Sequence, residues 1–177
     1  NKINSLTIII RSYTFGDVND DKVMLDQNKK RIFEFPKIEY TLRTIKSVIK
    51  SCEKSKECFK NLDINIIVTD DKSNQANLDK IKKLLNSTII KTELINLSED
   101  EFASEIKDKD INGKLVSKNM LSNMRNILKS IRISEKSNSD LFYFLEDDYI
   151  HKNEAITEML FTYEKLSTQL DSDLFLC

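Results

Sequence analysis

The chain has 177 residues, of which 40% are hydrophobic and 32% are charged, with 28 Lys and Arg against 29 Asp and Glu. A chain of this length can bury about 70% of the surface that its unfolded form exposes, so it is long enough for one domain with a proper core. The mixed and nearly neutral charge argues against nucleic acid as the main partner.

The N-terminal part of the chain predicts one strand and one helix. Residues 5–10 form a short run rich in β-branched side chains, which is typical of a strand buried on both faces. The charged and aperiodic residues 16–36 indicate an exposed loop or insertion. Apolar residues at helical spacing then predict a helix over residues 40–50.

The pattern of a strand followed by a helix repeats in the next part. Residues 64–68, INIIV, predict a second buried strand that ends in the polar sequence TDDKSN. Helical spacing returns over residues 78–85, and either Ser73 or Asn74 is available as the N-cap of that helix. Residues 88–97 predict a third strand.

The C-terminal part continues the alternation. The acidic residues 98–114 predict a variable loop with one helical turn, and an amphipathic helix is expected to begin near Ser117. The apolar positions of that helix are Leu121, Met124, Leu128 and Ile131. Residues 141–145, LFYFL, predict a fourth strand, and a further helix follows with Asn153 as its cap. Residues 174–176, LFL, are a candidate fifth strand.

This order of elements predicts the class of fold. Strands that alternate with helices are typical of an α/β domain with a mainly parallel sheet that helices cover on both faces. In such sheets the ligand crevice lies outside the carboxyl ends of the strands. The residues that follow each predicted strand are therefore the candidates for a functional site.

Two acidic clusters follow predicted strands. Asp70 and Asp71 come after the second strand, and the triplet of Glu146, Asp147 and Asp148 comes after the fourth. Adjacent carboxylates suit Mg²⁺ or Mn²⁺, which take oxygen ligands and complete their coordination with substrate phosphates. A metal ion there would orient a diphosphate and neutralise charge on the leaving group. The simpler alternative is a solvated turn before a helix, where acids are also favourable.

The motifs LTIIIRSY, INIIVTDDKSNQ, SNMRNILKSI and LFYFLEDDY occur in this order along nearly the whole chain. Together they resemble the nucleotide-sugar-binding half of GT-A glycosyltransferases, in particular the family 2-like group. The resemblance implies a GT-A, Rossmann-like fold in a single domain over residues 1–177, truncated before the acceptor-binding half. It also implies a divalent-metal-dependent, inverting transfer of a sugar from a UDP- or GDP-sugar to the hydroxyl of a glycan, a lipid-linked or another acceptor.

The resemblance assigns roles to the acidic residues. Asp71 matches the second acid of the family's DDxS motif, which implies that it binds the base of the nucleotide, with Asp70 beside it in the nucleotide site. Asp148, the last acid of a triplet similar to the DxD motif, is implied as the ligand of Mn²⁺ or Mg²⁺. Asp147 is implied as a contact of ribose, sugar or metal. Glu146 occupies the first position of the DxD-like triplet, where the family more commonly has an aspartate.

Basic and hydroxyl residues are further candidates for the site. Arg125, in the sequence MRN, matches an arginine that points towards the nucleotide in the family, and a planar guanidinium suits phosphate oxygens. A surface arginine on a helix is the alternative. Arg11 and Ser12 are candidates for lining the base or phosphate pocket, or else belong to a plain loop. His151, the single histidine, is interpreted as facing solvent rather than as a metal ligand or base.

Other features of the sequence modify this hypothesis. The connection after the first strand is longer than is usual in the family, so the mouth of the pocket is expected to differ. The general base of an inverting transfer is expected beyond the fifth strand, so no catalytic residue is assigned here. Two alternatives remain, namely a phosphoacceptor receiver-type signalling domain and a GT-A-like binding module without catalysis.

Cysteine content and hydropathy bear on the compartment. The odd set of Cys52, Cys58 and Cys177 lacks a CxxC pair and indicates reduced thiols rather than disulfides or a zinc site. No apolar run approaches the roughly 20 residues of a transmembrane helix, and no secretion pattern is present. We expect a cytoplasmic protein, or one peripheral to the inner face of the membrane. The absence of an initial Met suggests a segment of a longer protein.

Overall fold

The computed structural model describes residues 2–14, 36–98, 100–109 and 111–175. Within these ranges, four parallel strands form one sheet in the order β3-β2-β1-β4. Their bounds are Ser5–Ser12 for β1, Asp63–Asp70 for β2, Lys91–Asn96 for β3 and Leu141–Glu146 for β4. The expected α/β class and the parallel sheet are therefore confirmed.

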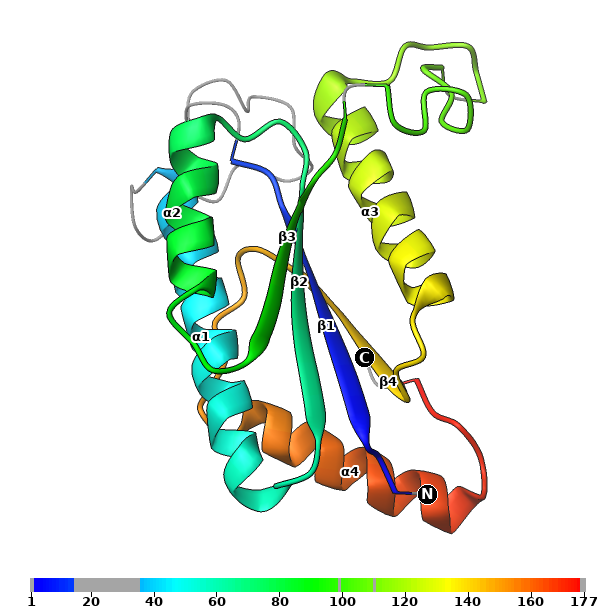
Figure 1. The fold of residues 1–177 in the computed structure, drawn as a ribbon. Coiled ribbons are helices and arrows are strands. Elements are labelled where there is room, and N and C mark those ends of the chain that lie inside the picture. The colour runs from blue at the N-terminus through cyan, green and yellow to red at the C-terminus, as the bar shows by residue number, and fades with distance from the viewer. Residues whose placement is uncertain (1, 15–35, 99, 110, 176–177) are drawn as a thin grey trace, which may run out of the picture.

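Four helices in the described part of the chain flank the sheet, and their bounds are Lys37–Cys58 for α1, Gln75–Leu85 for α2, Lys118–Lys136 for α3 and Ala155–Leu170 for α4. In Figure 1, α1 and α2 lie on one side of the strands and α3 lies on the other. The sheet order explains this, because β2 and β3 add to one side of β1 whereas β4 adds to the other, and right-handed crossovers then place α3 on the opposite face. Helix α4 packs against α1.

The core lies at the two central strands. Ile8, Ile9 and Ile10 of β1 are each 0% exposed, as expected of a strand that is covered on both faces. On one face their neighbours include Ile66 and Val68 of β2, which belong to the same cluster of buried residues. The isoleucine-rich sequence of β1 thus follows directly from its central place in the sheet.

Helix α1 is longer than the predicted helix over residues 40–50. The apolar pattern did not predict its C-terminal part because the buried face there is partly polar. Ser51 and Ser55 are fully buried, and the Ser55 hydroxyl donates to the Cys52 carbonyl at 2.8 Å. The Ser51 hydroxyl accepts a hydrogen bond from the Ile156 amide at 3.0 Å. Small hydroxyl residues thus continue the packed face where apolar spacing ends. Residues 16–35 of the predicted loop lie outside the described residues.

Helix α3 begins where predicted, with Ser117 as its N-cap, but its buried face is different from the one expected. Ser122, Asn126 and Ser130 are 2%, 3% and 1% exposed, whereas Met124 and Ile131 are 40% and 43% exposed. Two of these polar side chains, Ser122 and Asn126, bind residues at the strand ends, as described below, whereas Ser130 donates to the Asn126 carbonyl of its own helix.

Three smaller predictions need correction. Strand β3 begins at Lys91 rather than at residue 88, and Ile89 is 88% exposed. Glu154, not Asn153, holds the N-cap position of α4, with no side-chain capping bond. Leu174 and Phe175 of the expected fifth strand are not in a strand, because a three-residue run needs a neighbouring strand to pair with; Leu176 lies outside the described residues. The N-cap of α2 is Asn74, one of the two candidates.

None of the helices in the described ranges combines the length and the apolar character that a bilayer crossing requires.

Candidate functional site

The carboxyl ends of three strands lie side by side, as the sequence predicts. Ser12 of β1 pairs with Asp70 of β2, and Arg11 of β1 pairs with Glu146 of β4. We call this border of the sheet the carboxyl edge. It brings both acidic clusters next to the end of β1.

Asp70 is a buried anchor at the carboxyl edge. Its Oδ1 accepts hydrogen bonds from the hydroxyls of Ser12 at 2.5 Å and Ser73 at 2.6 Å, and its Oδ2 accepts one from the Ser73 amide at 3.0 Å. Burial raises the pKa of Asp70, the hydrogen bonds from Ser12 and Ser73 oppose that rise, and the nearby charge of Asp147 adds to it. Asp70 therefore holds the ends of β1 and β2 together.

Residues 12–14, which are the last residue of β1 and the two that follow it, accept hydrogen bonds from, or donate them to, side chains from three different parts of the chain. The contacts are Asn126 Nδ2 to Ser12 O at 3.0 Å, Tyr13 N to Asp147 Oδ2 at 3.3 Å and Thr14 N to Ser73 Oγ at 3.0 Å. Helix α3, the end of β4 and the turn after β2 thus all hold this segment. It forms a preorganised floor for the carboxyl edge.

Asn126 is a residue that the sequence analysis missed. Its Oδ1 accepts a hydrogen bond from the Thr69 hydroxyl at 2.5 Å, and its Nδ2 donates to the carbonyls of Ser12 and Thr69. The signal that was available is its spacing of four residues from both Ser122 and Ser130, which predicts one polar helical face.

Asp71 and Arg125 lie together but contact other parts of the protein as well. Asp71 is 1% exposed, and its Oδ2 accepts from the Ser122 hydroxyl at 2.6 Å and lies 3.7 Å from Arg125 Nη1. Arg125 Nε donates to the Glu101 carbonyl at 3.1 Å, and its Nη2 donates to the Ser98 carbonyl. The guanidinium thus ties the turn after β3 to α3, and its predicted contact with a nucleotide stays a prediction.

The three acids after β4 have three different surroundings. The Glu146 side chain is 52% exposed and pairs with Arg11 at 2.8 Å, and Arg11 also donates to Asn123. Asp147 is 4% exposed. Asp148 is exposed, and within the described part of the chain its carboxylate has no hydrogen bond or ion pair.

Asp147 points back into the protein. Its Oδ2 accepts a hydrogen bond from the Thr41 hydroxyl at 2.7 Å, in addition to the one from the Tyr13 amide. Its Oδ1 lies 3.3 Å from Lys37 Nζ. Thr41 and Lys37 belong to the first turns of α1, so Asp147 links the end of β4 to α1 and to the end of β1.

The positions of these carboxylates show which of them could bind a divalent cation at the carboxyl edge. In the described ranges, no three His, Cys, Asp or Glu side chains come close enough to form a metal centre by themselves. Mg²⁺ is commonly held by one or two carboxylates together with substrate phosphates. The exposed carboxylate of Asp148 fits a cation held jointly with a diphosphate, whereas both oxygens of Asp147 already have protein partners.

His151 is half-buried, and its ring packs against Tyr143 rather than extending freely into solvent. Its Nε2 lies 2.9 Å from the Tyr143 hydroxyl, and its backbone N–H donates to Ser47 Oγ at 3.0 Å. Burial lowers the pKa of His151, partly opposed by the Tyr149 backbone. The residue therefore packs the segment between β4 and α4 against α1, which replaces the expected solvent-facing ring.

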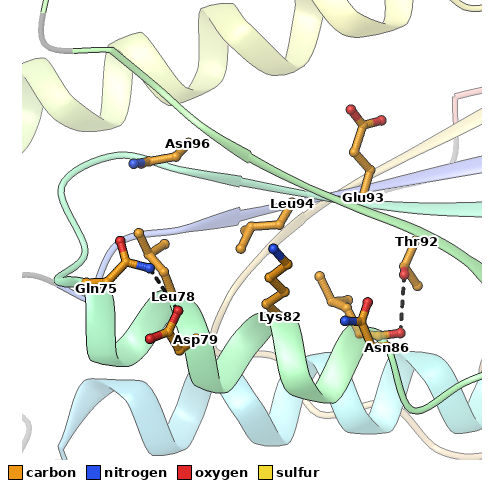
Figure 2. A pocket seen from close by; sticks show the side chains of 10 residues that line it. Gln75, Leu78, Asp79, Lys82, Asn86, Thr92, Glu93, Leu94 and Asn96 are labelled. Atoms are coloured by element: carbon orange, nitrogen blue, oxygen red, sulfur yellow. Dashed lines mark hydrogen bonds between the residues drawn. The ribbon is translucent and has the colours of Figure 1, made fainter.

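A separate groove of about 390 Å³ runs between α2 and the outer strand β3 (Figure 2). It is lined by Gln75, Leu78, Asp79, Lys82, Leu85, Asn86, Thr92, Glu93, Leu94 and Asn96. Gln75 donates to Asp79 at 2.8 Å, and Thr92 donates to the Leu85 carbonyl at 3.2 Å. None of the acids of the carboxyl edge lines this groove, although Asn96, at the end of β3, pairs with Asp70.

Comparison of the chain with models of protein families, with curated proteins and with solved structures found no match.

Proposed function

We propose that the chain is the nucleotide-sugar-binding part of a divalent-metal-dependent glycosyltransferase, which transfers a sugar from a UDP- or GDP-sugar to an acceptor hydroxyl. The observation that supports this function best is the difference among the acids at the carboxyl edge. Asp70, Asp71 and Asp147 are all less than 5% exposed and are bonded within the protein. Asp148 is exposed beside them, where a ligand can reach it.

In this proposal different residues of the carboxyl edge bind different parts of the nucleotide-sugar donor. Asp148 holds the cation, which when bound supplies Lewis-acid charge neutralisation at the diphosphate. Both contacts of Asp71 use Oδ2, and we assign its Oδ1 to an N–H of the base. Ser12, Asp70 and Arg125 shape the floor of the site through the contacts described above, and Arg11 lies at its border with Glu146.

Nucleotide binding tests this proposal directly. Calorimetric titration with UDP and with GDP, each with and without Mn²⁺, is expected to give binding only when the metal is present. Asp148→Asn is expected to weaken that binding at least about 10-fold, equivalent to about 1.4 kcal/mol. Asp140→Asn is the matched control, because this carboxylate accepts from the Asn4 and Ser5 amides at the opposite end of the sheet. A wild-type chain that binds neither nucleotide in the presence of metal excludes the proposal.

The two alternatives predict different results. A receiver-type domain needs an aspartate that a phosphate donor can reach, and at the carboxyl edge Asp148 is exposed whereas Asp70 and Asp71 are 0% and 1% exposed. Labelling of the chain by acetyl phosphate that is lost in Asp148→Asn would therefore favour the receiver-type alternative. A binding module without catalysis shares the metal-dependent binding of the nucleotide. Transfer or hydrolysis of a UDP-sugar separates that module from an enzyme.

A further inference from the structure

Asp147 and Asp148 are neighbours in sequence, but their carboxylates have opposite surroundings. Asp148 is exposed, whereas Asp147 is 4% exposed and directed towards α1. Two adjacent acids after a strand would form a two-carboxylate cation site only if both carboxylates faced the ligand. The question is therefore which of the two can bind a cation in the folded protein.

The partners of Asp147 occupy both of its oxygens. The Thr41 hydroxyl donates to Oδ2 at 2.7 Å, the Tyr13 amide donates to the same oxygen at 3.3 Å, and Lys37 Nζ lies 3.3 Å from Oδ1. Thr41 is itself 0% exposed, and its hydroxyl has a second, longer hydrogen bond to the Lys37 carbonyl at 3.4 Å, so Asp147 is its closer partner. Breaking such buried contacts leaves unsatisfied polar groups, which is costly.

We propose that Asp147 is a positioning residue and not a metal ligand, so that, of the two aspartates in the acidic triplet, Asp148 is the one that binds the cation. Asp147 binds the start of α1 and the amide of Tyr13, and this fixes the backbone from which the Asp148 side chain extends towards the ligand. The inference rests on the proposed function, since it concerns the binding of the same metal and nucleotide.

The decisive variant changes a residue that no ligand can touch. Thr41→Val removes the hydroxyl that holds Asp147 and keeps the shape of the side chain. If Asp147 positions Asp148, Thr41→Val lowers the affinity for UDP in the presence of Mn²⁺ about 3- to 10-fold, and Thr41→Ser restores it. If Asp147 is instead a ligand, loss of the hydroxyl releases its carboxylate, and the affinity stays the same or rises.

Helix α1 offers a matched control for this variant. Thr44 is also 0% exposed and lies on the same helix, but its hydroxyl has no hydrogen-bond partner among the described residues. Thr44→Val is expected to leave nucleotide binding within about twofold of wild type. Lys37→Met is the second test variant, since it removes the other partner of Asp147 at a side chain that is 20% exposed.

The readouts are calorimetric affinity for UDP, free Mn²⁺ measured by electron paramagnetic resonance, and urea denaturation to verify folding. Asp148→Asn is expected to abolish Mn²⁺ retention with UDP, whereas Asp147→Asn, Thr41→Val and Lys37→Met weaken it without abolishing it. Full affinity in Thr41→Val and Lys37→Met, with complete loss in Asp147→Asn, overturns the inference and makes Asp147 a ligand. Lack of metal-dependent binding in the wild type overturns the proposed function, and this inference with it.

Discussion

The side-chain amide of Asn126 lies 3.0 Å from the carbonyl oxygen of Ser12, and it is only 3% exposed. The same Nδ2 donates to the carbonyl of Thr69 at 3.3 Å. A single residue of α3 therefore joins the ends of two neighbouring strands, β1 and β2. This bond supports the position at which Ser12 and Asp70 meet.

Asn126→Ala is expected to lower the free energy of unfolding by about 2–4 kcal/mol, because it leaves buried groups of both strands unsatisfied. Urea denaturation measures this change. Asn123→Ala is the control on the same helix, because Asn123 is exposed and accepts one bond from Arg11; its effect is expected to be about 0.5 kcal/mol or less. Equal effects of the two variants would show that the strand-end bonds of Asn126 contribute little.

Arg125 is expected to stabilise the turn after β3. Arg125→Lys loses the guanidinium contacts with the carbonyls of Ser98 and Glu101, and each hydrogen bond to a charged group contributes about 1.5–3 kcal/mol. Hydrogen exchange of residues 98 and 100–106 is expected to accelerate about 10-fold or more. Arg132→Lys is the control, since Arg132 pairs on the surface with Glu105, and it is expected to change exchange less than about twofold. Unchanged exchange in Arg125→Lys contradicts the assignment.

Asp70 is expected to make stability depend on pH in the acidic range. Burial raises the pKa of its carboxyl in the folded state above the ordinary value of 3.8, so the folded state binds its proton more tightly than the unfolded state. The free energy of unfolding therefore contains a contribution that is fully present below pH 3.8 and is lost as the pH rises through the raised pKa.

Asp70→Asn removes this titration, so the difference in stability between wild type and variant is expected to shift in favour of the variant as the pH rises. Urea denaturation at a series of pH values measures the difference. If the free energies of unfolding of the two proteins change with pH in parallel, Asp70 does not cause the pH dependence.

His151 is expected to give the opposite dependence near neutral pH. Burial lowers the pKa of its ring below the ordinary value of 6.5, so the unfolded state binds the proton more tightly. The resulting stability is present above pH 6.5 and is lost as the pH falls through the lowered pKa. His151→Gln is expected to flatten the curve in this window. Tyr143→Phe should keep the dependence, because burial rather than the tyrosine hydroxyl lowers this pKa; a flat wild-type curve would count against the burial of the ring.

Much of the fold could be predicted because the apolar patterns in the sequence correspond to buried strands and helix faces in the structure. The β-branched residues Ile8, Ile9 and Ile10 lie in the central strand β1, and the helical spacing of apolar residues over 78–85 lies within α2. The acids after β2 and β4 were placed at one edge because parallel strands end on the same side of a sheet. The face of α3 was predicted wrongly, because periodicity detects apolar side chains and the buried stripe of this helix is polar.

The sequence by itself determined the order of the first four strands and their helices, the class of fold and the placing of both acidic clusters at strand ends, since these depend on local pattern and chain direction. Only the tertiary structure decided which of those acids face inward. Asp147 and Asp148 are identical in chemistry and adjacent in sequence, but Thr41 and Lys37, more than a hundred residues earlier, bind one and not the other. The surroundings of a carboxylate are set by such distant partners, which no local pattern encodes.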